Sequence, residues 1–252
     1  MPRFFFGRSI FMTIKKPLYK SILLKLSGES LMGDQGFGIH AETCLKVAKD
    51  IKFICDAGVR VSIVLGAGNI FRGVNGGAFA MKRVVADQVG MFSTIINGTV
   101  MQQCLESLGC TAHVMSGFAH GGIVERYDWR AASEALDRGE IVIFVGGTGN
   151  PFFTTDTAAA LRASEFKADL LLKATKVDGI YDQDPVKFPQ ASKYDKISYT
   201  QAIQDQLRVM DITAMTLCME NHVPIRVVQT SSIARAIYEA DLGTIVEGES
   251  QV

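Results

Sequence analysis

Residues 141–166 read IVIFVGGTGNPFFTTDTAAALRASEF, and this stretch indicates the fold class. It begins with five apolar residues in succession, which predict a strand that is buried on both faces. A glycine-rich loop follows, and residues 155–166 have the spacing and composition of a helix. A strand, a short glycine-rich loop and a helix in that order are typical of an α/β protein with a parallel sheet.

The same alternation of strand-like and helix-like segments extends along the rest of the chain. Further strands are expected at residues 20–27, 59–65, 111–116, 169–174, 225–229 and 243–246, and further helices at 41–57, 84–108, 128–138, 211–221 and 231–240. Apolar strands separated by amphipathic helices predict a mostly parallel sheet covered by helices on both faces. Ligands of such folds bind beyond the carboxyl ends of the strands, where most of the glycine-rich segments fall.

The composition is that of a globular protein, because 48% of the 252 residues are hydrophobic and 21% are charged. The 26 basic and 26 acidic residues cancel, so the formal net charge is +0. Such a chain lacks the basic excess with which proteins bind nucleic acids or anionic membranes. We therefore expect neither as a partner, and an anionic ligand must be held by a local site.

We expect an N-terminal arm, residues 1–18, followed by a single domain, residues 19–250. A true start at Met12 would leave residues 1–11 outside the folded protein. The chain has an odd number of cysteines and no CxxC pair; they are Cys44, Cys55, Cys104, Cys110 and Cys218. This pattern predicts free thiols in a reducing cytoplasm.

The longest uncharged run of the chain is residues 88–105. Its length resembles that of a membrane span, but it contains Gln88, Asn97, Gln102 and Gln103, whose polar groups would be costly in lipid. A helix buried in the core or in a subunit interface explains the run better.

Two glycine-rich loops precede the long helix. Lys25 interrupts an apolar strand, so it either reaches solvent or carries its charge to a phosphate; Ser27 and Gly28 behind it favour the second interpretation. Residues 66–73 read GAGNIFRG, which is neither a dinucleotide fingerprint nor a Walker A loop. This loop is either a plain turn or a set of backbone donors beside the guanidinium of Arg72 that suits an oxyanion.

Two more loops lie in the second half of the chain. The loop before the helix at 155–166 should point its backbone N–H donors towards the N-terminus of that helix, where anions bind. Asp156 is there either as a first-turn acid or as a carboxylate that orients a lysine or serves magnesium. After the strand at 169–174, Thr175, Tyr181 and Asp184 either line a purine pocket or form a polar connection.

Two further aspartates can also be interpreted in either structural or functional terms. Asp87 either caps the long helix or accepts hydrogen bonds from ribose hydroxyls, and Asp211 is most simply the N-cap or a first-turn acid of its helix. The loops together supply lysines, an arginine, backbone donors and spare carboxylates, without a nucleophilic triad or a metal cage. This combination is typical of phosphoryl transfer, which needs positioning and charge neutralisation. The residues alone do not identify the acceptor.

Six motifs, KLSGES, GAGNIFRG, RVVADQVGM, GGTGNPFFTTD, LLKATKVDGIYDQDP and VMDITA, occur in this order between about residues 19 and 246. In this order they resemble the bacterial-type uridylate (UMP) kinases of the amino acid kinase family. The resemblance implies a three-layer αβα sandwich with one active-site cleft at the strand ends. It also implies the reaction ATP + UMP → ADP + UDP, with Mg²⁺, in pyrimidine nucleotide synthesis.

The resemblance also implies roles for particular residues. Lys25, Arg72 and Asp156 would be catalytic. ATP would be bound by Lys25, Leu26, Ser27, Gly28, Gly68, Arg72, Thr175, Tyr181 and Asp184. UMP would be bound by Ala67, Asp87, Thr148, Gly149, Asn150, Pro151, Phe152, Phe153, Thr154 and Thr155. The metal would be held mainly through the ATP phosphates, with no direct protein ligand. Many family members have a glycine in place of Ala67, whose methyl group is tolerable only where φ is negative.

Members of this family are typically hexamers in the cytoplasm, activated by GTP and inhibited by UTP. The matching allosteric segment would be Gly33, Asp34, Gln35, Gly36, Phe37 and Gly38, and the helix over residues 88–105 would be a dimer interface. The alternatives are a catalytically silent nucleotide-binding protein, regulatory or for storage, on the same fold, and another small-molecule kinase of the family.

Overall fold

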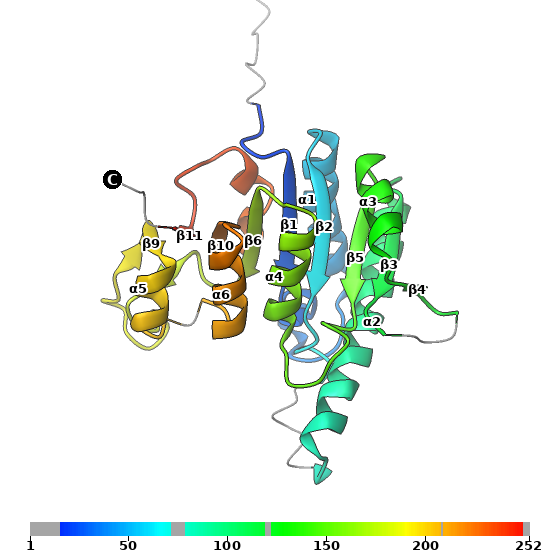
Figure 1. Ribbon diagram of the computed structural model, residues 1–252, viewed down its shortest axis with the longest axis horizontal. Coiled ribbons are helices and arrows are strands. Elements are labelled where there is room, and N and C mark those ends of the chain that lie inside the picture. Colours follow the sequence, from blue (N-terminus) through cyan, green and yellow to red (C-terminus); the bar gives the residue numbers. More distant parts are fainter. Residues whose placement is uncertain (1–15, 72–78, 119–121, 208, 249–252) are drawn as a thin grey trace, which may run out of the picture.

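The computed structural model describes residues 16–71, 79–118, 122–207 and 209–248. Its centre is a nine-stranded sheet with the order β4-β3-β5-β2-β1-β6-β10-β11-β9 (Figure 1). The strands are β1 Ser21–Leu26, β2 Arg60–Leu65, β3 Ala112–Ser116, β4 Glu125–Arg126, β5 Ile141–Val145, β6 Leu170–Thr175, β9 Lys196–Ser198, β10 Ile225–Gln229 and β11 Thr244–Glu247. Among the described strand pairs of this nine-stranded sheet only β10–β11 is antiparallel, so the predicted mostly parallel sheet is confirmed.

Helices cover both faces of the sheet (Figure 1). α1 (Ala41–Asp56) and α2 (Arg83–Ser107) pack on one face, and the other face is covered by α3 (Trp129–Asp137), α4 (Thr155–Glu165), α5 (Tyr199–Gln204) and α6 (Ile212–Glu220). Each layer has its own apolar core against the sheet. The three-layer αβα sandwich expected from the resemblance is therefore confirmed.

Strand β1 lies in the middle of the sheet and is buried along its whole length. Ile22, Leu24 and Leu26 face the layer of α1 and α2, whereas Leu23 faces the layer of α4 and α6. Because side chains alternate along a strand, Lys25 shares the face of Leu23. The strand therefore brings a buried lysine under the N-terminal end of α4.

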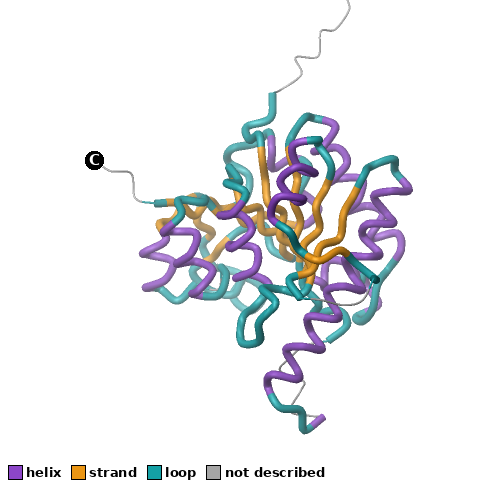
Figure 2. The backbone as a smooth tube through the Cα atoms, turned by 45° about the vertical axis from the view of Figure 1, so that its right-hand side comes forward, coloured by secondary structure: helices purple, strands orange, loops and turns teal. Residues whose placement is uncertain are grey.

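Helix α2 extends beyond the sheet at the carboxyl ends of the strands (Figures 1 and 2). Met101 and Leu105 in its second half are buried, whereas Val85, Phe92 and Ile96 are exposed. Among the described residues, no helix combines the length and the apolar character that crossing a membrane requires.

The prediction of a helix at residues 231–240 is wrong. The structure has two short 3₁₀ turns there, Thr230–Ser232 and Arg235–Ile237. The buried Arg226 on β10 explains the difference, because its Nη1 donates to the carbonyl oxygens of Ala236 at 3.4 Å and Glu239 at 3.0 Å. A side chain from another element thus takes carbonyls of this segment, and no α-helix forms.

Several short elements have no counterpart among the sequence expectations. They are two 3₁₀ turns, Gly28–Leu31 and Gly33–Gln35, together with β4, α5, β9 and an antiparallel pair of β7 (Ile180–Tyr181) and β8 (Lys193–Tyr194). Of the expected arm at 1–18, residues 1–15 lie outside the described residues; Leu18 donates its backbone N–H to Ile237 at 2.8 Å.

Candidate active site

The candidate site lies where the central strands β5, β2, β1 and β6 end. The loops that leave these strands begin at Gly146, Gly66, Ser27 and Lys176, so all four glycine-rich segments singled out in the sequence meet at one edge of the sheet. This arrangement follows from the parallel topology, which puts the carboxyl ends of neighbouring strands side by side.

A buried cluster of three charges is the centre of this edge. Lys25 on β1 and Lys173 on β6 are register partners on adjacent parallel strands. Asp156, in the first turn of α4, lies over both: its Oδ1 is 2.6 Å from Lys25 Nζ, and its Oδ2 accepts a hydrogen bond from Lys173 Nζ at 2.8 Å. Lys173 also donates to the carbonyl oxygen of Val209. The predicted catalytic pair Lys25 and Asp156 is thus in direct contact.

Helix capping sets the position of Asp156. Thr154 is the N-cap of α4 and its Oγ1 accepts from the Asp156 N–H at 3.0 Å. The Thr154 hydroxyl in turn donates to Asp211 Oδ2 at 2.5 Å, and Asp211 caps α6 by accepting from the Ala214 N–H. The predicted N-cap role of Asp211 is confirmed, and the same carboxylate ties the starts of α4 and α6 together.

Burial and charge act in opposite directions on this cluster. Burial alone would raise the pKa of Asp156, but the positive charges of Lys25 and Lys173 hold it below its ordinary value. Burial lowers the pKa of Lys173, and the attraction of Asp156 offsets only part of that effect. The carboxylate is therefore ionised at neutral pH, and the cluster has two cationic positions for one anion.

The loop after β1 packs closely against the backbone of the loop after β2. Ser27 caps the turn Gly28–Leu31 by accepting from the Glu29 N–H at 3.3 Å. A Cβ on Gly28 would overlap the side chain of Asn69 and would lie 2.8 Å from both Gly66 O and Gly68 N. Only glycine fits there, so the backbones of two predicted phosphate loops lie against each other. Arg72, predicted to be catalytic, lies outside the described residues.

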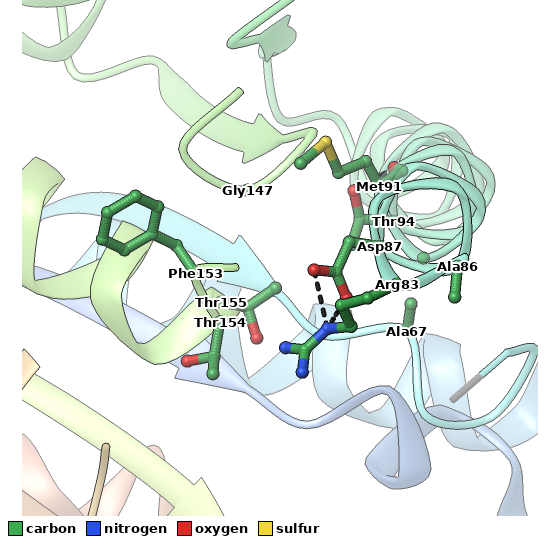
Figure 3. A pocket seen from close by; sticks show the side chains of 11 residues that line it. Ala67, Arg83, Ala86, Asp87, Met91, Thr94, Gly147, Phe153, Thr154 and Thr155 are labelled. Atoms are coloured by element: carbon green, nitrogen blue, oxygen red, sulfur yellow. Dashed lines mark hydrogen bonds and ion pairs between the residues drawn. The ribbon is translucent and has the colours of Figure 1, made fainter. Parts of the chain in front are cut away.

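One cavity, here called the α2 pocket, has a volume of about 420 Å³ (Figure 3). It is lined by Ala67, Arg83, Ala86, Asp87, Gly90, Met91, Thr94, Gly147, Phe153, Thr154 and Thr155. Five of the residues predicted to bind UMP are therefore in one cavity: Ala67, Asp87, Phe153, Thr154 and Thr155. Ala67 is not among the described non-glycine residues with positive φ, so its methyl group costs no backbone strain.

Asp87 projects from α2 into this pocket (Figure 3). Its carboxylate accepts from Arg83 Nε at 2.8 and 2.9 Å and from the backbone N–H of Phe152 at 2.8 Å. Phe152 has a φ of 70°, a conformation that non-glycine residues rarely adopt. Asp87 therefore holds both the first turn of α2 and a strained turn of the loop that follows β5.

A second cavity, here called the β6 pocket, has a volume of about 570 Å³. Thr175, Tyr181 and Asp184, all predicted to line an adenosine pocket, lie on its wall together with Lys173 and Val227. The hydroxyl of Tyr181 donates to Asp178 Oδ1 at 2.6 Å. Of the charged cluster, Lys173 lines the β6 pocket, whereas Asp156 does not line the α2 pocket but follows its lining residue Thr155 in the first turn of α4.

Some predicted residues are not brought into either cavity. The predicted UMP residues that do not line the α2 pocket are Thr148, Gly149, Asn150, Pro151 and Phe152. The predicted ATP residues that line neither cavity are Lys25, Leu26, Ser27, Gly28 and Gly68. Gly149 instead lies against the loop after β3, where a Cβ would be 2.5 Å from the carbonyl oxygen of Gly117. The predicted allosteric segment 33–38 lines neither cavity, and Phe37 within it is 67% exposed.

The site also contains residues to which the sequence assigned no role. Lys173 had the same signal as Lys25, a lysine within an apolar strand, and the same argument would have found it. Arg83 and Thr94 lie one turn before and two turns after Asp87, a helical spacing that could have placed them on its face. Thr94 accepts a hydrogen bond from the Gly146 N–H at 2.7 Å.

Comparison with known proteins gives a consistent result. A family model described as "Amino acid kinase family" matches residues 20–229. The chain is 56% identical to a uridylate kinase of Protochlamydia amoebophila over 82% of each chain. It is 48% identical to a uridylate kinase of Methylococcus capsulatus, over 92% of this chain and 98% of the relative.

Solved structures agree with the sequence comparisons. A UMP kinase from Bacillus anthracis superposes with a TM-score of 0.86 at 34% identity, over 92% of this chain and 97% of that one. A UMP kinase from Ureaplasma parvum superposes with a TM-score of 0.85 at 34% identity, over 90% of this chain and 98% of that one.

Proposed function

The chain belongs to the amino acid kinase family, and from that premise we propose that it is a kinase that transfers the γ-phosphoryl group of ATP to UMP, giving ADP and UDP. The observation that supports this proposal is the buried cluster of Lys25, Asp156 and Lys173, of which Lys173 lines the β6 pocket and Asp156 follows Thr155 of the α2 pocket. Each cavity contains part of the residue set that the sequence assigned to one of the two nucleotides.

On the donor side, we assign adenosine to the β6 pocket, with Thr175, Tyr181 and Asp184 on its wall. The triphosphate then extends towards Lys25 and the backbone of residues 26–28. Gly68 and Arg72 would contact it from the loop after β2. The close packing of Gly28 against Gly66 and Gly68 supports this assignment, because it leaves backbone at the place where phosphate oxygens would bind.

On the acceptor side, we assign UMP to the α2 pocket. Asp87 is the group that would accept from the ribose hydroxyls, and Ala67 would donate its backbone N–H. The loop 148–155 would enclose the uracil base and the phosphate, with Phe153, Thr154 and Thr155 in the cavity wall. Arg83 adds a guanidinium that faces the same space (Figure 3).

In the transfer step, an oxygen of the UMP phosphate forms a bond to the γ-phosphorus, and the bond from that phosphorus to the β–γ bridging oxygen breaks. The electron pair stays on ADP, so no covalent enzyme intermediate is needed. Lys25 neutralises the charge that spreads over the moving phosphoryl group. Asp156 holds the two lysines in orientation, as its contacts at 2.6 and 2.8 Å support.

Magnesium would accompany ATP, and the residues present fit that mode of binding. Asp156 Oδ1 is buried and ion-paired with Lys25, but it accepts no hydrogen bond with good geometry from the described residues. Mg²⁺ in kinases is usually held by one or two carboxylates plus substrate phosphates. In the described part of the chain, no three His, Cys, Asp or Glu side chains form a metal site of their own. Bound to the phosphates, the ion would supply further charge neutralisation.

The proposal includes a homo-oligomer, with the hexamer of the family as the expected size. Its support is the exposed apolar surface of α2, where Val85, Phe92 and Ile96 are 43%, 54% and 50% exposed. GTP activation through residues 33–38 and UTP inhibition remain predictions. A cytoplasmic location is also proposed, supported by five cysteines that are all free thiols in the structure.

An acceptor panel tests the proposed function. We expect ADP release from ATP and Mg²⁺ to require UMP, and to be slow or absent with CMP, dTMP, glutamate or carbamate. The reason is that the α2 pocket presents hydrogen-bonding groups for a ribonucleotide, which dTMP, glutamate and carbamate leave partly unpaired. CMP has the same ribose and phosphate as UMP, so it should be rejected at the base edge that the loop 148–155 would enclose. A coupled spectrophotometric assay gives the rates. Turnover with an amino acid or carbamate and none with UMP would contradict the proposal.

The Asp87→Asn variant tests the assignment of the two pockets. We expect the KM for UMP to rise about tenfold or more, because a charged acceptor of hydrogen bonds is lost. The KM for ATP should stay near the wild-type value. Thr175→Val in the β6 pocket is the matched control, and it should raise the KM for ATP and not that for UMP. The opposite pattern in steady-state kinetics would mean that the two pockets have been exchanged.

A further inference from the structure

Two asparagine side chains, Asn69 and Asn97, are buried behind the phosphate loops, with 2% and 0% of their surface exposed. They form a reciprocal amide pair. Asn69 Nδ2 donates to Asn97 Oδ1 at 3.0 Å, and Asn97 Nδ2 donates to Asn69 Oδ1 at 2.8 Å. Burying two amides is costly unless their hydrogen-bonding groups are satisfied, so this pair holds a defined geometry.

The remaining amide protons of the pair reach two different loops. Asn97 donates to the carbonyl oxygen of Gly66 at 2.8 Å, and Asn69 donates to that of Gly38 at 2.8 Å. The backbone N–H of Gly38 returns a bond to the Asn69 carbonyl at 2.8 Å. All four side-chain N–H groups of the pair are therefore used.

The pair also sets the distance between the two phosphate loops. The side chain of Asn69 occupies the space where a Cβ of Gly28 would lie, and the Gly66 N–H donates to the Leu26 carbonyl at 2.8 Å. Neither asparagine lines the α2 or the β6 pocket. Any effect of the pair on nucleotides must therefore pass through the backbone of Gly28 and Gly66.

We propose that Asn69 and Asn97 are positioning residues for phosphoryl transfer. Asn97 on α2 holds the carbonyl of Gly66, and Asn69 in the loop after β2 fills the space beside Gly28. The pair thereby fixes the backbone of residues 66–68 against the loop that begins at Gly28, and so sets the relative positions of donor and acceptor phosphates. This inference rests on the proposed function. Its physical reason is that reacting groups must be aligned closely, and a displacement of about 1 Å can cost about a hundredfold in rate.

The Asn97→Asp variant tests the proposal, because it keeps the shape of the side chain and removes both N–H donors. At pH 8 its carboxylate faces the Gly66 carbonyl and Asn69 Oδ1 without a proton to share. We expect kcat to fall about ten- to a hundredfold. The KM values should change much less. Burial raises the pKa of the introduced carboxyl, so lowering the pH towards 6 should protonate it, restore one donor and recover part of kcat.

A matched control is Gln102→Glu, which makes the same amide-to-carboxyl change on the same helix. Gln102 Nε2 donates to the Ala112 carbonyl at 2.7 Å, away from the phosphate loops. This control should keep the wild-type kcat and pH profile. A gain of kcat on acidification that is confined to Asn97→Asp would support positioning when the melting temperature shows that the variant is folded at both pH values.

A second variant, Asn69→Asp, covers the case in which Asn97→Asp does not fold. It leaves the Asn97 bond to Gly66 in place and loses the donors to Gly38 and to Asn97 Oδ1, so it should fold and lose less kcat than Asn97→Asp. Melting temperatures and nucleotide Kd values are measured beside the rates. A folded Asn97→Asp variant with wild-type kcat at pH 8 would overturn the positioning role. If Asn97→Asp does not fold, a wild-type kcat in Asn69→Asp would overturn it as well. If the wild-type protein transfers phosphate to another acceptor but not to UMP, the proposed function is contradicted instead. The kcat values of the asparagine variants and the wild type would then be compared with that acceptor.

Discussion

Replacing Lys25 by alanine is expected to lower kcat by at least about a hundredfold, the scale of removing one donor that stabilises transition-state charge. Lys25 is 8% exposed and its Nζ lies 2.6 Å from Asp156, so its charge is held in a site with little water. UMP binding should be affected less, because Lys25 does not line the α2 pocket. Steady-state kinetics and titration calorimetry with UMP measure the two effects separately.

Two further variants make this result specific. Lys25→Met keeps most of the side-chain volume without the charge, so it should lose as much kcat as Lys25→Ala if charge is what matters. Lys52→Ala removes a lysine from an exposed ion pair with Asp56 on α1 and should leave kcat unchanged. Near-normal turnover in Lys25→Ala would remove Lys25 from the mechanism.

The Asp156→Asn variant is expected to lose both activity and stability. It leaves Lys25 and Lys173 close together, mostly buried and without a counter-ion. Removing one partner of a buried ion pair costs about 3–5 kcal/mol. For a chain of this length that corresponds to a drop in Tm on the order of 10 °C. The kcat should fall at least about a hundredfold, because the two lysines lose their orientation.

The exposed pair of Arg60 and Asp137 is the matched control, since Asp137→Asn makes the same change where both side chains are mostly in water. Its effect should stay within about 1 kcal/mol. The pH dependence gives a second readout. Because the folded pKa of Asp156 is lowered, its contribution to stability is full above the ordinary value of 3.8 and is lost as the pH falls below it. Asp156→Asn should lack that part of the acid destabilisation. Equal melting temperatures of Asp156→Asn and wild type at pH 7 would contradict the stabilising role of Asp156 in the charged cluster.

Much of the sheet could be predicted because its strands are continuous apolar runs. Residues 141–145 match β5 in full, and 225–229 match β10. The helix expected at 231–240 failed because a buried arginine from β10 competes for its carbonyls. A contact between distant residues of that kind leaves no local pattern. The two-residue strands β4, β7 and β8 also depend on tertiary pairing more than on propensity.

The candidate site could be predicted where a residue was out of place in its own segment. Lys25 in an apolar strand is such a signal, and it points to the contact with Asp156. The amide of Asn97 within the uncharged helix is a similar signal, but nothing local names Asn69 as its partner. The failure of residues 148–152 to line the α2 pocket was not foreseeable, because Gly149 packs against the loop after β3, which is distant in sequence.

The central claim is that a phosphoryl group moves from ATP to UMP across the edge formed by Lys25 and the loop before α4. Label transfer tests it most directly, because ADP release alone also follows from hydrolysis. With ATP labelled in the γ-phosphate, Mg²⁺ and UMP, the account predicts that the label appears in UDP in step with ADP, and that Lys25→Ala abolishes both together. Label found in inorganic phosphate or in another acceptor, with none in UDP, would contradict it.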